Sequence, residues 1–282
     1  MLEIAIPNKG SLSEKSVELL EEAGYRSRRR GRELVLDDPN SDLRIFFLRP
    51  RDIAVYVGQG RIHAGITGRD LLADSRVVAH EYAPLGFARA TFRFAAPAGT
   101  ITTLEQIRGK RIATSYRNLV LNYLDQRGIE ADVVRLDGAV ESSIQLGVAD
   151  LIADVVETGS TLRAAGLEVF GEPLIESEAI LITNQAGAKD PAVAVLNRRL
   201  QGVLLAKKYV LVDYHVPAEI LADAEKITPG FESPTVSPLA DTDWRAVRAV
   251  VSRSSMNQVM DDLLAVGAKG IIVSELIASR LG

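Results

Sequence analysis

The sequence contains no cysteine among its 282 residues. This absence excludes disulfide bonds, thiolate nucleophiles and zinc sites built from thiolates. The sequence also lacks a basic excess, since 33 Lys and Arg stand against 37 Asp and Glu for a formal net charge of −4. Proteins that bind nucleic acid usually carry such an excess on one face, so we expect no nucleic-acid partner.

Long apolar runs are missing as well. No stretch approaches the roughly 18 apolar residues that a membrane helix needs. The N-terminal segment MLEIAIPNKGSLSEK has neither the basic start nor the long apolar core of a secretory signal. We therefore expect no membrane association and a cytoplasmic location. With 47% hydrophobic and 25% charged residues, the chain has the composition of a globular protein of two or three domains.

Short apolar strands alternate with helical stretches, which predicts an α/β fold with a mainly parallel sheet. Residues 60–68 (GRIHAGITG) and 147–155 (GVADLIADV) share a layout of glycine, turn and buried strand. The repeat arises by chance or indicates two similar lobes. In the second case Thr67 corresponds to Asp154, and both would face one cleft at the strand ends.

Two further elements are predicted from the pattern. A helix is expected over residues 137–147, with Asp137 as its N-cap. A strand, helix and strand unit begins near Val212 and is expected to form an appended small α+β domain.

The segment LIADVVETGSTL, residues 151–162, ends a dense apolar run in small and hydroxyl-bearing residues. These residues are Thr158, Gly159, Ser160 and Thr161. A phosphate needs several converging N–H donors, and small residues before a helix let the backbone approach it. Asp154 could accept hydrogen bonds from two ribose hydroxyls, so the pattern favours a ribose 5-phosphate. The alternative is an ordinary strand end followed by a helix cap. The glycines and lysine of an NTPase phosphate loop are missing.

The same segment resembles the phosphoribosyl-diphosphate loop of phosphoribosyltransferases, in which an acidic strand end precedes Thr-Gly-x-Ser/Thr. Many such enzymes carry two adjacent acids, whereas Ala153 precedes Asp154 here. Further matching segments are PNKGSLSE, FFLRPRDIAVYV, GITGRDLL, RIATSYRNLV, RLDGAVESSIQLGVAD and GEPLIESEA. Together they make essentially the whole chain similar to the ATP phosphoribosyltransferase family in its long, histidine-regulated form.

The resemblance implies an α/β fold class: two periplasmic-binding-protein-like (type II) lobes that form a catalytic cleft, and a C-terminal ferredoxin-like (ACT-like) α+β regulatory domain. The implied first lobe comprises residues 1–90 and 184–211, and the second comprises residues 91–183 with the phosphoribosyl-diphosphate loop. The implied regulatory, histidine-binding domain comprises residues 212–282. A homo-oligomer, dimer and hexamer, is expected.

In this family N1 of the ATP adenine displaces diphosphate from 5-phosphoribosyl 1-diphosphate. The product is phosphoribosyl-ATP, and the reaction is the first step of histidine biosynthesis. Mg²⁺ is the expected cofactor, bound through substrate phosphates and water rather than by a dedicated ligand cluster. No general base is predicted, because adenine N1 is itself a nucleophile.

The resemblance also implies roles for single residues. Thr158, Gly159, Ser160 and Thr161 would hold the 5-phosphate, and Asp154 the ribose hydroxyls. Positive charge develops on the ribose C1 as the glycosidic bond breaks, and Glu141 and Asp154 are the carboxylates that could stabilise it. The residues expected to face ATP and the diphosphate are Lys9, Arg49, Arg51, Asp70 and Tyr116. Lys9 is also expected to take part in catalysis. The guanidinium group of arginine is well suited to bidentate hydrogen bonds with phosphate.

The three histidines, His63, His80 and His215, are expected to be structural or exposed rather than catalytic. The positions implied for L-histidine, as a feedback inhibitor at a subunit contact, are His215, Thr235, Ser254 and Gly270. Relatives tend to carry an acid at position 215, which could pair with an amino group. Histidine cannot do so in the same way, so inhibition is expected to be weaker or differently built.

Two further departures from the family pattern introduce arginines. Arg117 stands where the pattern has proline, and it adds a cation beside the expected adenine side. Arg89 stands where small residues are usual. Two other functions also stay open. A non-catalytic solute-binding protein would carry a signal peptide or lipoprotein cysteine, and an inactive regulatory subunit would not need the phosphate loop and the cations.

Overall fold

The computed structural model describes residues 1–29, 31, 33–241 and 243–280. The chain divides into two compact units, residues 1–21 with 25–197, and residues 22–24 with 198–282. The predicted third domain ends with residues 281–282, which lie outside the described residues. None of the helices in the described ranges is long and apolar enough to cross a membrane.

The first sheet of the larger unit has three parallel strands at its centre. In spatial order its six strands are β2 (Val35–Asp38), β3 (Leu43–Leu48), β1 (Leu2–Pro7), β4 (Ala64–Gly68), β11 (Ala179–Thr183) and β5 (His80–Pro84). The helices that follow its parallel strands are α1 (Ser11–Glu22), α2 (Pro50–Gly58) and α3 (Arg69–Ser75). β1 pairs in parallel with both β3 and β4, and β11 returns antiparallel to β4.

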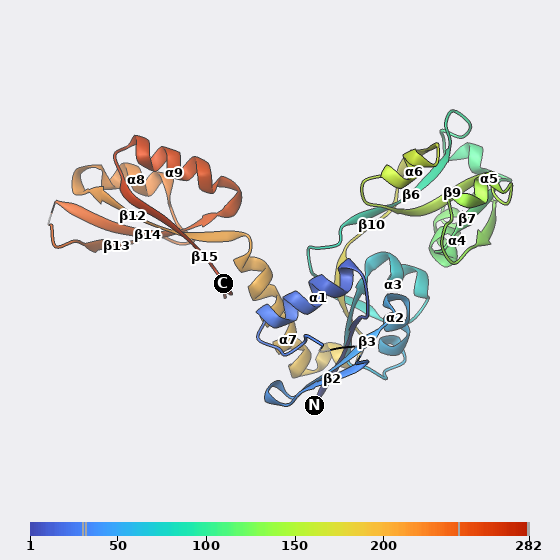
Figure 1. The fold of residues 1–282 in the computed structure, drawn as a ribbon, viewed down its shortest axis with the longest axis horizontal. Coiled ribbons are helices and arrows are strands. Elements are labelled where there is room, and N and C mark those ends of the chain that lie inside the picture. Colours follow the sequence, from blue (N-terminus) through green and yellow to red (C-terminus); the bar gives the residue numbers. More distant parts are fainter. Residues whose placement is uncertain (30, 32, 242, 281–282) are drawn as a thin grey trace. The chain divides into compact units, whose positions relative to one another are not determined.

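The second sheet is built in the same way. In spatial order its strands are β10 (Leu167–Ser177), β6 (Ala90–Pro97), β9 (Leu151–Val156), β7 (Arg111–Thr114) and β8 (Asp132–Arg135). The helices that follow its parallel strands are α4 (Arg117–Asp125), α5 (Ser142–Gln145) and α6 (Ser160–Ala164). β7 pairs in parallel with β8 and β9, and β6 runs antiparallel to β9 (Figure 1).

The two sheets therefore repeat one plan, as the sequence repeat suggested. The parallel order β3-β1-β4 corresponds to β8-β7-β9. Ala5 pairs with Gly65 in the first sheet and Ala113 with Ile152 in the second. Gly65 and Ile152 are therefore equivalent positions, and so are Thr67 and Asp154, two residues further along each strand, as predicted. The predicted role of Thr67 is wrong, because its buried hydroxyl donates to the Pro50 carbonyl oxygen instead of facing a cleft.

Two predictions about local structure need correction. Residues 179–183 were expected in the second lobe, but they form β11 of the first sheet, because the chain crosses back and pairs with β4. The helix expected over residues 137–147 is shorter, and α5 has Glu141 rather than Asp137 at its N-cap position. Gly138 and Ala139 adopt positive φ angles of 123° and 47°, which no right-handed helix accommodates.

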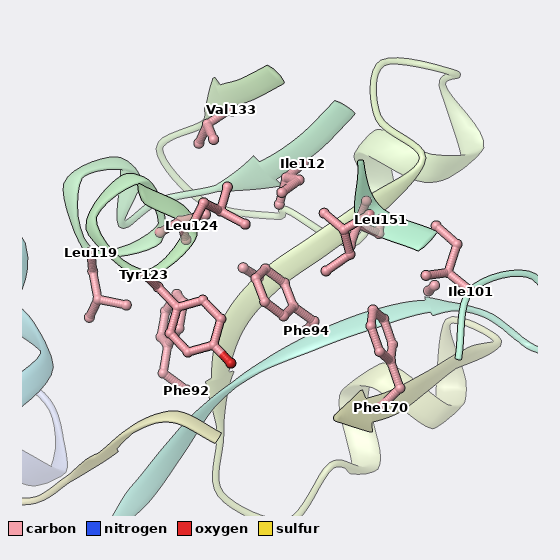
Figure 2. Packing of buried hydrophobic residues seen from close by; sticks show 14 residues of the cluster. Phe92, Phe94, Ile101, Ile112, Leu119, Tyr123, Leu124, Val133, Leu151 and Phe170 are labelled. Carbon is pink, nitrogen blue, oxygen red and sulfur yellow. The ribbon is translucent and has the colours of Figure 1, made fainter. Parts of the chain in front are cut away.

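The core of the second lobe lies between β6, β9 and α4. Leu119 and Tyr123 of α4 belong to this core, and Phe94 packs against Tyr123 and Phe170 with ring centroids 5.7 and 6.0 Å apart (Figure 2). α4 repeats apolar positions on one face, which is why this segment forms an amphipathic helix. Tyr116, in the loop that follows β7, also packs against this core, with its ring centroid 5.0 Å from that of Phe92.

The smaller unit has the order strand, helix, strand, strand, helix, strand. Its elements are β12 (Tyr209–Pro217), α8 (Leu221–Ile227), β13 (Thr235–Pro238), β14 (Trp244–Ser252), α9 (Met256–Ala265) and β15 (Lys269–Glu275). The spatial order β13-β14-β12-β15 is that of a ferredoxin-like domain, as predicted. α9 buries Val259 and Leu263 against the sheet. The boundary between the two units falls inside α7 (Pro191–Ala206), ahead of the predicted start at residue 212.

Short 3-10 segments complete the description. They are η1 (Pro39–Ser41), η2 (Glu105–Ile107), η3 (Gly187–Lys189), η4 (Ala218–Ile220) and η5 (Arg253–Ser255).

Candidate active site

The candidate residues of the first lobe follow the carboxyl ends of its parallel strands. Lys9 follows β1, Arg49 follows β3 at the N-cap position of α2, and Asp70 follows β4 in the first turn of α3. Open α/β sheets bind ligands at this edge. Lys9 and Arg49 are exposed, whereas Asp70 is only 6% exposed. The three residues therefore occupy one sheet edge, with both cations facing solvent.

The second lobe places its candidates at the equivalent edge. Tyr116 follows β7, Glu141 precedes α5 in the connection after β8, and Asp154 lies near the end of β9. All three side chains are partly buried. Because the two sheets share one plan, each lobe presents its polar residues at the same place.

The loop from Thr158 to Thr161 has the geometry of a compact turn into a helix. Gly159 is the N-cap residue of α6 at φ 71°, a left-handed conformation that favours glycine. The hydroxyls of Thr158 and Ser160 lie 3.1 Å apart, and Arg163 donates from Nη2 to the Thr158 carbonyl oxygen at 3.1 Å. The first amides of α6 have no acceptor within their own helix. The loop is thus held by Arg163 while its hydroxyls remain exposed.

The carboxylate of Asp154 lies within the electrostatic influence of two others, Glu141 of its own lobe and Asp70 of the first lobe. Burial raises the pKa of Asp154 above its usual range, and the negative charges of Glu141 and Asp70 raise it further. The amide of Val155, which donates to Asp154 Oδ1 at 2.8 Å, opposes this rise. Asp154 therefore lies in a partly desolvated, negatively charged setting that a cation or a pair of hydroxyls would relieve.

Asp70 is tied to Ser177, a residue that the sequence analysis did not identify. The Ser177 hydroxyl donates to Asp70 Oδ1 at 2.6 Å and accepts from the Asp70 amide at 3.1 Å. The Tyr116 hydroxyl also lies against this carboxylate. The pKa of Tyr116 is raised, mainly by burial and then by the charge of Asp70 and a hydrogen bond with it. Tyr116 is therefore a neutral hydrogen-bond donor in this setting.

Arg51 connects this group to α3. Its guanidinium forms an ion pair with Asp74 and lies 4.8 Å from the centroid of the Tyr116 ring. The positive charge of Arg51 partly offsets the rise in the pKa of Tyr116. The structure thus brings together five predicted residues. They are Arg51, Asp70, Tyr116, Glu141 and Asp154. Lys9 and Arg49 lie at the same sheet edge, and in the described ranges neither side chain forms an ion pair with these five residues.

Three neighbours of the candidate site were missed in the sequence. Asp74 stands four residues after Asp70 on α3, and this spacing puts both carboxylates on one helix face, a signal that could have found it. Ser177 and Arg163 gave no such signal, because their partners depend on the fold. Arg117 begins α4, and its Nε donates to the Val133 carbonyl oxygen at 3.4 Å.

The positions implied for histidine separate into two places on the sheet of the smaller unit. His215 and Thr235 line a cavity of about 240 Å³, and a Cβ on Gly270 would lie 3.6 Å from His215 Nδ1. Ser254 lines a different cavity of about 540 Å³ with Tyr209, at the other end of β12. Within one chain the structure therefore groups three of these residues and leaves Ser254 apart.

The remaining two histidines lie in a structural and an exposed setting. His63 Nδ1 accepts a hydrogen bond from the Glu3 amide at 3.1 Å, which joins β1 to the start of β4. His80 is exposed on β5. In the described part of the chain, no group of three or more His, Asp or Glu side chains is arranged to hold a metal ion.

Comparison with known proteins gives a consistent picture. A family model described as ATP phosphoribosyltransferase matches residues 49–202, and one described as the HisG C-terminal domain matches residues 206–278. An ATP phosphoribosyltransferase of Arthrobacter sp. (strain FB24) is 59% identical over 286 residues and covers 100% of both chains. One of Bifidobacterium longum (strain DJO10A) is 59% identical over 283 residues, again with 100% of both chains covered.

A solved structure shares the fold over 73% of this chain. A chain of the ATP phosphoribosyl transferase (HisG:HisZ) complex from Thermotoga maritima is 26% identical, with a TM-score of 0.63. The match covers 73% of this chain and 99% of that chain. The predicted fold class is confirmed as an α/β protein with two lobes of one plan and a ferredoxin-like C-terminal domain.

The raised pKa of Asp154 predicts a stability change that depends on pH. A carboxyl whose pKa is raised on folding contributes stability below its unfolded pKa and loses it as the pH rises through the folded pKa. Asp154→Asn cannot ionise, so it should raise the free energy of unfolding at pH 7. This gain should vanish below about pH 4, where the unfolded carboxyl is also protonated. Urea unfolding of the native chain and the variant, at pH 7 and again below about pH 4, measures this difference in the free energy of unfolding. The control is Asp137→Asn, which removes the charge of a side chain that is 89% exposed. A gain equal at both pH values, or equal in the control, would contradict the prediction.

Proposed function

This chain belongs to the ATP phosphoribosyltransferase family, and we propose that it joins N1 of ATP to C1 of 5-phosphoribosyl 1-diphosphate and releases diphosphate. The product would be N1-(5-phosphoribosyl)-ATP, the first intermediate of histidine biosynthesis. The observation that carries this proposal is the pairing of the Thr158–Thr161 loop with Asp154 on β9, next to Arg51 and Tyr116 of the ATP side. An enzyme that uses these two substrates would act in the cytoplasm.

The phosphoribosyl half of the reaction would belong to the second lobe. The hydroxyls and first-turn amides of the loop would hold the 5-phosphate, and Asp154 would accept hydrogen bonds from the ribose diol. α6 has only five residues, so hydroxyls and amides, rather than a strong helix dipole, would supply most of the binding. The raised pKa of Asp154 supports this role, because two hydroxyl donors would stabilise its ionised form.

The ATP half would belong to the first lobe and to Tyr116. Arg51 would meet the phosphates or the departing diphosphate, with Lys9 and Arg49 as further cations at the same sheet edge. The new N1–C1 bond forms as the C1–oxygen bond breaks, and diphosphate takes the electron pair. Glu141 and Asp154 would stabilise the positive charge on C1. No general base is needed for this step, so catalysis rests on positioning and charge.

Mg²⁺ is the proposed cofactor, and the residues present are compatible with it. The ion usually takes one or two protein carboxylates and otherwise binds phosphates and water. Asp154 and Glu141, whose charges interact, would be those carboxylates. Bound there, the ion would neutralise the departing diphosphate.

The test of the proposed function is an assay with ATP, phosphoribosyl diphosphate and Mg²⁺. We expect rising near-ultraviolet absorbance from phosphoribosyl-ATP, and no product when any one component is left out. Calorimetry with amino acids and oxyanions tests the solute-binding alternative. Lack of turnover under all conditions would support an inactive regulatory subunit instead and would overturn the proposal.

The loop residues give a second prediction. Replacing Thr158 by Val and Ser160 by Ala removes two hydroxyl donors to the 5-phosphate. Each hydrogen bond to a charged group contributes about 1.5–3 kcal/mol, so affinity for phosphoribosyl diphosphate should fall by roughly tenfold or more. Calorimetry measures this, and the KM for ATP should change little. Thr100→Val, which removes an exposed hydroxyl of the same lobe, is the control. Unchanged affinity in the double variant would show that the loop is misassigned.

Histidine regulation is a separate proposal for the smaller unit, together with assembly as a homo-oligomer of dimers and hexamers. His215, Thr235 and Gly270 would form one part of the site. Ser254 lies apart within one chain, so it would reach the same ligand only at a subunit contact.

This proposal predicts that L-histidine inhibits the enzyme and that His215→Asp strengthens the inhibition. A carboxylate at position 215 would pair with the amino group of the ligand, and we expect the inhibitory concentration to fall by roughly tenfold, as for one charge-assisted hydrogen bond. Titration of activity with L-histidine measures this, with His80→Asp as a control of equal charge change at an exposed site. Equal inhibition of the native chain and the His215 variant would contradict it.

A further inference from the structure

The helix α4 begins without a cap of its own. Its N-cap residue, Tyr116, makes no side-chain hydrogen bond to the helix. The first amides of a helix need acceptors and favour a negative charge. The acceptor for these amides comes from the first lobe. Asp74 Oδ1, near the end of α3, accepts from the amides of Asn118 at 2.8 Å and Leu119 at 3.1 Å.

The same carboxylate also binds the cation of the candidate site. Asp74 Oδ2 accepts from Arg51 Nη1 in an ion pair. The Asn118 amide side chain adds a bond to the Asp74 carbonyl oxygen at 2.8 Å. Asp74 is only 5% exposed, and a buried carboxylate is tolerated where both of its oxygens have partners. One side chain thus joins α2, α3 and α4.

We propose that Asp74 is a positioning residue for the ATP half of the reaction. It sets the place of the Arg51 guanidinium and, through the first turn of α4, the place of Tyr116. This inference rests on the proposed function, in which both of these residues face ATP. Asp74 itself does not touch the substrate.

The geometry of Arg51 supports this role over a purely structural one. A guanidinium has five N–H donors in a fixed plane. Asp74 engages Nη1, and no other hydrogen bond of this guanidinium occurs within the described ranges. The Arg51 side chain is 36% exposed, whereas Asp74 is buried. Asp74 therefore holds one corner of the guanidinium over the Tyr116 ring and leaves the remaining donors accessible to a polyanion.

The experiment compares Asp74→Asn with Asp52→Asn in the full-length enzyme. Both variants remove one negative charge, and Asp52 is exposed on α2 directly after Arg51. We expect Asp74→Asn to raise the KM for ATP tenfold or more and to leave the affinity for phosphoribosyl diphosphate within twofold, by calorimetry. Asp52→Asn should leave both values within twofold of the native enzyme.

A double-mutant cycle with Arg51→Gln separates positioning from general destabilisation. On the Arg51→Gln background, Asp74→Asn should raise the KM for ATP by less than threefold, because coupled residues are not additive. Three results would overturn the inference: an unchanged KM for ATP in Asp74→Asn, fully additive effects of the two substitutions on that KM, or an equal loss of affinity for ATP and for phosphoribosyl diphosphate.

Two controls keep the outcome decisive. If Asp74→Asn does not fold, the same measurements are made on Asn118→Ala, which removes the side-chain hydrogen bond to the Asp74 carbonyl oxygen. A rise in the KM for ATP alone supports the inference, and an equal effect on both substrates or no effect overturns it. Failure of the native enzyme to form product would defeat the proposed function, whereas an active enzyme that is insensitive at Asp74 would defeat this inference alone.

Discussion

Two buried carboxylates one helical turn apart, Asp70 and Asp74, hold the candidate site together. Both carboxylates belong to α3 of the first lobe, and each accepts hydrogen bonds from the second lobe: Asp70 from Ser177 of β10, and Asp74 from the first turn of α4. A carboxylate taken from water must be fully partnered, so neither lobe can present this helix face alone. The positions of Arg51 and Tyr116 depend on the same contacts.

The repeated plan of the two sheets explains how two different substrates could be served. Parallel strands in the order β3-β1-β4 and β8-β7-β9 end at equivalent edges, and the loops there differ. At the matching register position, Thr67 is buried and bonded to the Pro50 carbonyl oxygen, whereas Asp154 is partly exposed with a raised pKa. The framework is thus common, and the chemical difference lies in single side chains at the strand ends.

The sequence predicted those features that depend on local pattern. The strand that carries Asp154, the loop that follows it and a small C-terminal α+β unit follow from periodicity, small residues and strand ends, whereas the ferredoxin-like topology of that unit was implied by the family resemblance. Features that depend on distant partners were missed. Asp74 bonds to amides more than 40 residues away, and β11 joins the first sheet only because the chain returns to it. The helix start expected at Asp137 failed because Gly138 and Ala139 turn left-handed, and nothing in the periodicity reports a positive φ at an alanine.

The chain passes between the sheets at two adjacent connections, and this has a mechanical consequence. Only Glu178 separates β10 from β11, and its carboxylate accepts from the Gly86 amide of the other connection at 2.9 Å. Ser177 is the neighbouring residue, so its bond to Asp70 lies beside the pivot of any rotation of one lobe against the other. Such a rotation would leave that bond almost unstretched. It would strain the hydrogen bonds of Asp74 to the first turn of α4 earlier, so those bonds would break before the bond of Ser177 to Asp70.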